Sequence, residues 1–363
     1  MGRRKALPVK VAGVTIGGDA PVSIQSMTNT DTTDIKATLK QIERLFKAGC
    51  ELVRVAVIDE SGARSLGLIK KHSPLPVIAD IQFDFKLALQ CLEEGADKIR
   101  FNPGNIGDND KLAQIIKKAK EKGIPLRIGV NSGSISREVR KKYGGATADA
   151  LVDSALQTIR FLENSTFHNF IVSLKAANVL TTVEAYRKIA DQIPYPLHLG
   201  VTEAGRGLKG AVKSSLGIGS LLLDGIGDTV RVSLTGDPVE EVYVAKEILQ
   251  AAGVRNFGPE IISCPTCARC KIDLEQLVKK VEEAVKNVDR PLKIAVMGCP
   301  VNGPGEAREA DIGISGADNF GIIFKAGKVF KKVALPDLFG ALEQEISEML
   351  KQKSSGNTSR NGG

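Results

Sequence analysis

Short runs of hydrophobic and β-branched residues recur along the first 250 residues, each leading through a polar or glycine-rich end into a stretch with helical spacing. The stretch IKATLKQIERLFKAG from Ile35 is typical of the helical part and closes on a glycine. Eight consecutive strand–helix units predict an α/β fold, a (β/α)8 TIM-type barrel over residues 1–250. A doubly wound open sheet is the alternative, but no dinucleotide-binding glycine fingerprint accompanies the units. The eight runs begin at Val22, Leu52, Val77, Lys98, Leu126, Phe170, Leu197 and Thr229.

Polar side chains lie in or directly after these runs, where a barrel enzyme places its active site. The candidates are Arg54, Asp80, Gln82, Arg100, Asn102, Arg127, Asn131, Ser173, Lys175, His198, Glu203, Arg231 and Ser233. Lys213 follows the seventh run in a glycine-rich segment, a frequent phosphate site in this fold. A single buried arginine can belong to an internal salt bridge. Basic side chains on five different apolar strands would instead cost several kcal/mol each if left unpaired, so we predict that they bind a polyanion such as a phosphate group.

A second group of chemically active residues lies near the carboxyl end, in SCPTCARC and MGCPVNGPGE. Cys264 and Cys267 form a C-x-x-C pair, and Cys299 ends the apolar run KIAVM before a Gly-Pro-Gly loop that leads to Glu306. Three thiolates and a carboxylate can ligate a [4Fe–4S] cluster and leave one iron with a displaceable oxygen ligand.

Spacing alone also fits a structural zinc site. A zinc ribbon usually supplies a second C-x-x-C or a Cys/His pair, whereas the second half of this motif offers only Cys299 and a glycine-rich loop. This difference favours an iron–sulfur cluster over a zinc site. Cys270 extends the motif to C-x-x-C-x-x-C, a spacing also found in ferredoxins, and we interpret it as a spare thiol. Cys50 and Cys91 lie in or beside helical segments and are expected to be inert core thiols.

Composition limits the possible partners. The net charge of +8 would suit nucleic acid, but aromatic residues make up only 4% and tryptophan is absent, so anionic small molecules or an acidic protein partner are favoured. We expect a cytoplasmic protein, because the amino-terminal segment lacks an apolar stretch, no segment is long enough to span a membrane, and a cluster with unpaired thiols fits a reducing compartment. Residues 353–363 carry no apolar side chain and are expected to form a disordered tail.

Taken together, the motifs resemble the bacterial 4-hydroxy-3-methylbut-2-enyl diphosphate synthase family of the methylerythritol phosphate route to isoprenoids. They are GGDAPVSIQSMTNTDT, IRFNPGNIG, RIGVNSGS, HLGVTEAG, KSSLGIGSLLLDGIGDTVRVSLTGDP, SCPTC and GCPVNGPGEAREADIGI, and they run through nearly the whole chain. The resemblance implies a barrel followed directly by a small α/β iron–sulfur domain, here residues 260–352. Cys264, Cys267, Cys299 and Glu306 match the ligands of a [4Fe–4S] cluster.

The resemblance also implies the reaction, which is reductive ring opening and dehydration of 2-C-methyl-D-erythritol 2,4-cyclodiphosphate with two electrons from flavodoxin or ferredoxin. Glu306, Glu203 and Asp80 are the candidate catalytic residues, and the remaining strand-end side chains bind substrate. A homodimer is expected, because the linker at residues 249–260 is short and the family resemblance points the same way. Two departures stand out: Gln82 replaces a usual histidine, and Cys270 is an unusual addition. A phosphate-binding barrel with a zinc module and a pterin-type transferase barrel are the alternatives.

Overall fold

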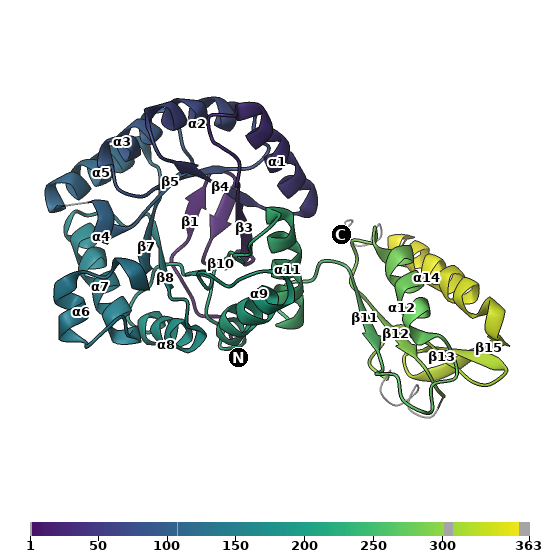
Figure 1. Cartoon of the computed structure of the whole chain (residues 1–363). Coiled ribbons are helices and arrows are strands. Elements are labelled where there is room, and N and C mark those ends of the chain that lie inside the picture. Colours follow the sequence, from purple (N-terminus) through teal and green to yellow (C-terminus); the bar gives the residue numbers. More distant parts are fainter. Residues whose placement is uncertain (1, 107, 301–307, 356–363) are drawn as a thin grey trace, which may run out of the picture. The chain divides into compact units, whose positions relative to one another are not determined.

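A computed structural model describes residues 2–106, 108–300 and 308–355. The chain divides into two compact units, Met1–Arg255 and Asn256–Gly363 (Figure 1). The predicted tail at 353–363 falls largely outside the described residues, and the last helix runs through Ser355.

The first unit is the predicted barrel. Its parallel strands pair in the order β8-β7-β6-β5-β4-β3-β10-β9, and a parallel bridge between Val172 and Leu197 joins the two ends of this order. Every predicted run contains one strand, so the fold class is confirmed. The strands are β3 (Ser23–Met27), β4 (Leu52–Val57), β5 (Val77–Ile81), β6 (Lys98–Phe101), β7 (Leu126–Asn131), β8 (Phe170–Lys175), β9 (His198–Leu199) and β10 (Thr229–Val230).

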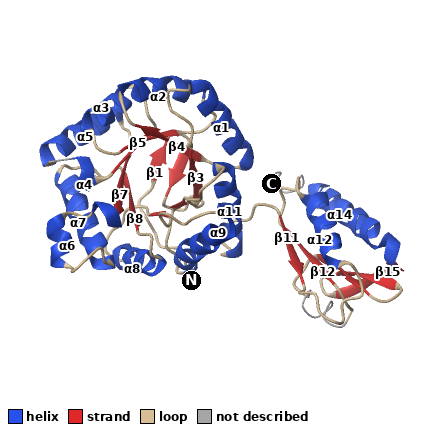
Figure 2. Ribbon diagram, in the orientation of Figure 1, coloured by secondary structure: helices blue, strands red, loops and turns tan. Residues whose placement is uncertain are grey.

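Helices surround these strands (Figure 2). In α1 (Ile35–Ala48), the Asp34 side chain accepts a hydrogen bond from the Ala37 amide, and Gly49 ends the helix at a φ of 92°. The apolar face of α1 is buried through Ile42 and Leu45. The other helices of this unit are α2 (Glu60–His72), α3 (Phe85–Glu93), α4 (Pro103–Ile106), α5 (Asn109–Lys122), α6 (Arg137–Lys142), α7 (Ala148–Asn164), α8 (Val179–Ala190), α9 (Gly207–Ser214), α10 (Ser220–Leu223) and α11 (Pro238–Ala251), with short turns η1 (Ser132–Ser134) and η2 (Ser215–Gly219).

A β-hairpin that the sequence analysis did not predict closes the amino-terminal end of the barrel. Its strands β1 (Val9–Val11) and β2 (Val14–Ile16) pair antiparallel, and β1 lies inside the ring of strands in Figure 1. Hairpin side chains share a core cluster with residues near the starts of β4, β5 and β8, so the floor of the barrel is apolar and closed. The cluster contains Val9, Val11, Ile16, Leu52, Ile78 and Ile171.

The first unit ends at this same floor. The Arg255 guanidinium donates to the carbonyl of Val22 at 2.8 Å and to the Glu51 carboxylate at 2.7 Å. Val22 and Glu51 directly precede β3 and β4. The chain therefore leaves the barrel at the end opposite to the carboxyl ends of its strands.

The second unit is a five-stranded sheet with helices on one face (Figure 2). Strands β11 (Pro259–Ser263), β12 (Leu292–Met297) and β13 (Ile312–Gly316) are parallel, and β14 (Phe320–Lys325) and β15 (Lys328–Ala334) continue the sheet antiparallel. Helices α12 (Leu274–Val285) and α14 (Leu338–Ser355), with the short turn η3 (Leu335–Asp337) before α14, pack on the sheet through an apolar cluster that includes Val281, Ile294 and Leu342.

Candidate functional site

A cationic pocket lies at the carboxyl ends of the barrel strands. Eight of the predicted substrate-binding residues line it, which brings together side chains from β4, β6, β7 and β8 and from the segments that follow β9 and β10. Arg54, Arg100, Arg127 and Lys175 are each less than 10% exposed. Its lining residues are Arg54, Arg100, Arg127, Asn131, Ser173, Lys175, Thr202, Arg231 and Ser233.

Asp80 anchors two of these arginines from below. Arg100 donates to its carboxylate at 2.8 Å, and the Arg54 guanidinium lies 3.5 Å from the other oxygen. Burial alone would raise the pKa of Asp80, but Arg54, Arg100 and Arg127 outweigh burial and hold this pKa below its usual value. Asp80 is therefore a carboxylate that orients arginines. It has no proton to donate near neutral pH.

Arg231 is held by an acidic residue that the sequence analysis missed. Glu241, on α11 and 3% exposed, accepts from Arg231 at 2.9 and 3.2 Å, from the Ser26 hydroxyl at 2.9 Å and from the Leu234 amide at 3.1 Å. Arg231 also donates to the Ser233 hydroxyl at 2.8 Å. Glutamate is ordinary on a helix surface, so no sequence signal marked this one as buried.

Lys175, like Arg127, forms no ion pair within the described residues, whereas Arg54, Arg100 and Arg231 each pair with a carboxylate. Burial lowers its pKa well below the usual value, and the nearby Arg127, Arg231, Arg54 and Arg100 lower it further. An added anion would relieve this repulsion. The pocket is thus a site with more cationic groups than anionic ones.

Two glycines make room for the long basic side chains. A Cβ at Gly129 would lie 2.7 Å from Nε of Arg100, and one at Gly200 would lie 2.6 Å from Nζ of Lys175. Such distances are shorter than van der Waals contact, so only glycine fits at either position without displacing the cation.

The remaining predicted residues of the barrel lie around the pocket without lining it. His198 is fully buried below it, and the backbone carbonyl of His198 accepts from the Tyr186 hydroxyl. Gln82 is partly buried after β5. Glu203 is exposed and has a φ of 53°, an uncommon conformation for a residue other than glycine. Lys213 donates to the Glu203 carbonyl at 3.1 Å and so ties α9 to the loop after β9.

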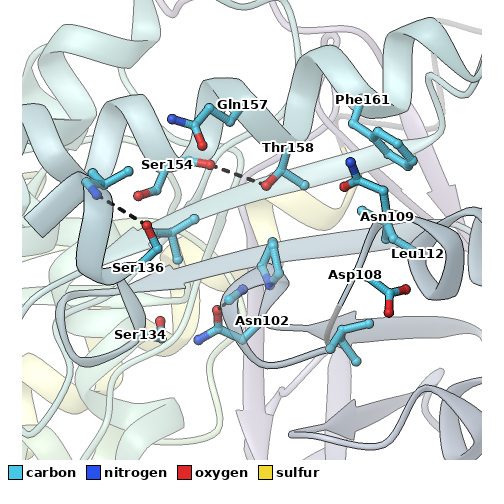
Figure 3. Close-up of a pocket in the computed structure, with 15 residues that line it drawn as sticks. Asn102, Asp108, Asn109, Leu112, Ser134, Ser136, Ser154, Gln157, Thr158 and Phe161 are labelled. Atoms are coloured by element: carbon cyan, nitrogen blue, oxygen red, sulfur yellow. Dashed lines mark hydrogen bonds between the residues drawn. The ribbon is translucent and has the colours of Figure 1, made fainter.

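Asn102 lines a second cavity of about 310 Å³, shown in Figure 3. Ser154, Gln157, Thr158 and Phe161 line it from α7. No lysine or arginine lines it among the described residues, so it lacks the charge to bind a phosphate group. We therefore place the anion site in the cationic pocket, which Asn102 does not line.

The cysteines of the second unit gather where two neighbouring parallel strands end. Cys264 follows β11, Cys299 follows β12, and the Gly298 amide lies 3.3 Å from the Cys264 sulfur. The space beside Gly298 is filled by Cys270, whose sulfur lies 2.5 Å from the position of an added Cβ. Cys267 is exposed on the loop between them, and its carbonyl accepts from the Cys270 amide at 2.9 Å.

Thiols from a C-x-x-C loop and a neighbouring strand end are the donor types that hold an iron–sulfur cluster, but the described side chains do not converge on one point. Glu306, the predicted fourth ligand, lies outside the described residues. Within the described ranges, no three His, Cys, Asp or Glu side chains are arranged as a metal site. Cys50 and Cys91 are buried in the barrel, and burial raises the pKa of each to about 12, which suits inert thiols.

No helix within the described ranges combines the length and apolar character needed to cross a bilayer. Among solved structures, a truncated 3-deoxy-D-arabino-heptulosonate 7-phosphate synthase from Thermotoga maritima covers 69% of this chain and 95% of its own, with a TM-score of 0.50 and 14% identity. This likeness concerns the barrel fold alone.

Two family models match this chain, and so do many curated relatives. Residues 6–246 match the GcpE TIM-barrel domain and residues 260–348 the GcpE protein C-terminal domain. A protein of Caldanaerobacter subterraneus subsp. tengcongensis is 52% identical over 97% of this chain and 99% of its own, and one of Fusobacterium nucleatum subsp. nucleatum is 55% identical over 96% and 99%. Both are named 4-hydroxy-3-methylbut-2-en-1-yl diphosphate synthase (flavodoxin). The family resemblance in the sequence is thereby confirmed, and the chain belongs to the GcpE family of enzymes.

Proposed function

We propose that this chain is a 4-hydroxy-3-methylbut-2-enyl diphosphate synthase, which opens 2-C-methyl-D-erythritol 2,4-cyclodiphosphate reductively and releases water. The observation that carries the proposal is the cationic pocket at the carboxyl ends of the barrel strands, in a chain whose second unit gathers thiols at one sheet edge. Neither the zinc-module barrel nor the pterin-type barrel explains both features together with the family match.

The barrel residues bind and orient the cyclic diphosphate. Arg54 and Arg100 are fixed by Asp80, and Arg231 is fixed by Glu241, so their guanidinium groups are positioned before the substrate arrives. Asn131, Ser173 and Thr202 line the same pocket and can donate hydrogen bonds to phosphate oxygens. We infer that Glu203 serves the reaction from the pocket rim, where Lys213 holds its backbone in an uncommon conformation.

Cys264, Cys267, Cys299 and Glu306 would hold a [4Fe–4S] cluster. When bound, such a cluster supplies single electrons and a Lewis-acidic iron with an exchangeable ligand. Cys270 stands beside the set and keeps its predicted role as a spare thiol. An acidic electron donor such as flavodoxin or ferredoxin would suit a chain with a net charge of +8.

Analysis of freshly purified anaerobic protein tests the proposal most directly. We expect about four irons and four sulfides per chain, a brown colour lost on oxidation, and conversion of the cyclic diphosphate to the allylic diphosphate with reduced flavodoxin. Colourless protein containing zinc, or brown protein that leaves the cyclic diphosphate unchanged under reducing conditions, would contradict it.

We also propose a homodimer in which the cluster unit of one chain serves the barrel of the other. Support comes from the end of the first unit, where Arg255 is tied to Val22 and Glu51 at the barrel floor, while the cationic pocket opens at the other end of the strands. Only residues 252–258 connect α11 to β11. Two reciprocal contacts would close with two-fold symmetry.

Mixing two inactive variants tests this arrangement. Cys267→Ala removes a cluster ligand and Arg127→Ala removes a pocket cation, so a mixed dimer retains one intact composite site. A random mixture is half heterodimers, and about a quarter of the wild-type activity should return. Confirmed subunit exchange without any recovered activity would place the site within one chain.

A further inference from the structure

Below the cationic pocket lies a layer of buried polar side chains that the proposed reaction has not used. Ser23, Thr229 and His198 are neighbours in register on β3, β10 and β9, and Lys98 begins β6. None of the four is more than 2% exposed. Within the described chain, no hydrogen-bond partner is found for Nζ of Lys98, for either ring nitrogen of His198, or for the hydroxyls of Ser23 and Thr229.

Lys98 has no counter-charge in this layer. The charged groups that act on it are Arg127 on β7 and Arg54 on β4, both cationic. His198 faces Arg127, Lys175, Lys98 and Arg54, which are also cationic. From the other packed elements come uncharged side chains: Ser23 and Gln25 from β3, Thr229 from β10, Ile78 beside Lys98 on β5, and the apolar hairpin.

The buried acidic groups that the structure describes in the barrel are already paired, and Asp228, directly before Thr229, binds Arg3. Asp80 binds Arg54 and Arg100, and Glu241 binds Arg231. A fully buried ammonium without a counter-ion loses its proton rather than pay the cost of desolvation. Burial, followed by the repulsion of Arg127 and Arg54, accordingly lowers the pKa of Lys98 well below its usual value.

A bound diphosphate reverses this balance. Arg127 and Arg54 line the pocket and also face Lys98, so phosphate groups that neutralise them remove the repulsion that Lys98 experiences. Resting on the proposed function, we propose that Lys98 is neutral in the substrate-free protein and takes up one proton from solvent when the cyclic diphosphate binds. Lys98 then supplies a positive charge beneath the substrate without touching it, as a positioning residue.

Proton uptake on binding can be assigned to the protein, because the cyclic substrate does not take up protons near neutral pH. Each of its phosphate groups is linked both to the other phosphate and to carbon, so each keeps a single, strongly acidic ionisation and does not titrate near neutral pH. Any proton taken up on binding therefore belongs to the protein. Lys175 is the competing source, because it lines the pocket and its pKa is also lowered by burial.

Calorimetric titration of the oxidised holoenzyme with the cyclic diphosphate, without an electron donor, tests the proposal. Binding heats measured at pH 7.5 in buffers of low and high ionisation enthalpy give the number of protons taken up. We expect Lys98→Met to lower this number by close to one and to weaken binding about three- to tenfold. Lys117→Met, at an exposed lysine of α5, is the control and should match wild type.

Three outcomes would overturn the proposal: an unchanged proton number in Lys98→Met, a wild-type protein that takes up no proton, or a Lys175→Met variant that loses the entire uptake. If Lys98→Met does not fold, the same titrations on Lys98→Gln decide. Failure of the proposed function looks different, because the wild type would then neither bind nor turn over the cyclic diphosphate.

Discussion

Replacing Lys175 by methionine separates the binding role of the pocket from its role in stability. The nearly isosteric change removes a charge from the pocket lining and leaves no acidic partner unpaired, because Lys175 forms no ion pair in the described part of the chain. A charge-assisted contact with a phosphate oxygen is worth about 1.5 to 3 kcal/mol, so the affinity for the cyclic diphosphate should fall roughly ten- to a hundredfold. The substrate-free protein should melt no lower than wild type, since methionine fills the same space and leaves no buried carboxylate without its partner.

Arg231→Met is the matched comparison, because it removes a pocket cation whose partner is buried. Glu241, 3% exposed, would lose its buried cationic partner, and breaking a buried ion pair by removing one partner costs about 3 to 5 kcal/mol. In a unit of this size, 1 kcal/mol shifts the melting temperature by about 2 to 4 °C, so Arg231→Met should melt about 6 to 20 °C lower. Titration calorimetry and differential scanning calorimetry measure the two effects. Wild-type affinity in Lys175→Met, or wild-type melting in Arg231→Met, would refute the reasoning.

Three further predictions concern the cluster, the glycines and pH. Alanine at Cys264, Cys267 or Cys299 should abolish iron retention, because we assign these three as ligands, whereas Cys270→Ala should retain iron. Iron analysis in which Cys299→Ala retains iron and Cys270→Ala loses it would contradict this assignment. Gly129→Ala should weaken substrate binding at least tenfold by displacing Arg100, whereas Gly133→Ala should not, because Gly133 has open space around it. Equal affinities of the two variants in calorimetry would show that Gly129 is not needed to make room for Arg100. Lys98 binds a proton more readily in the unfolded chain than in the folded one. The free energy of unfolding should therefore rise with pH between the lowered pKa of Lys98 and about 10.4, and this rise should be smaller in Lys98→Met. Parallel pH profiles of the two proteins in denaturant titrations would exclude a buried neutral Lys98.

The period of the hydrophobic pattern was sufficient to predict the barrel but not the direction of every side chain. Arg54, Arg100 and Arg127 were predicted to share a pocket because basic residues on apolar strands must share an anion, and the structure gathers them. Lys98 stands at the start of its run and is not among the predicted site residues. Whether such a residue faces the interior depends on how the strands are staggered when the barrel closes, which a local period does not encode.

Residues near strand ends were harder to place for the same reason. His198 and Asn102 share the polar character of the pocket residues, yet one lies beneath the pocket and the other beside it. Glu241 was missed because its burial depends on the approach of α11 to β3 and β10, a contact between distant segments. The cysteine motifs were easier to interpret, because thiol spacing restricts the possible ligand sets even when the fold around them is unknown.

The hairpin over the barrel floor has a consequence for how the amino terminus tolerates change. Val9, Val11 and Ile16 are less than 2% exposed and share their core cluster with strand residues beneath the polar layer. Deleting the first sixteen residues would let bulk water in from below, hydrate Lys98 and restore its ordinary basicity. Trimming this segment, which contains no candidate catalytic residue, would thus alter the electrostatics of catalysis at the far end of the barrel.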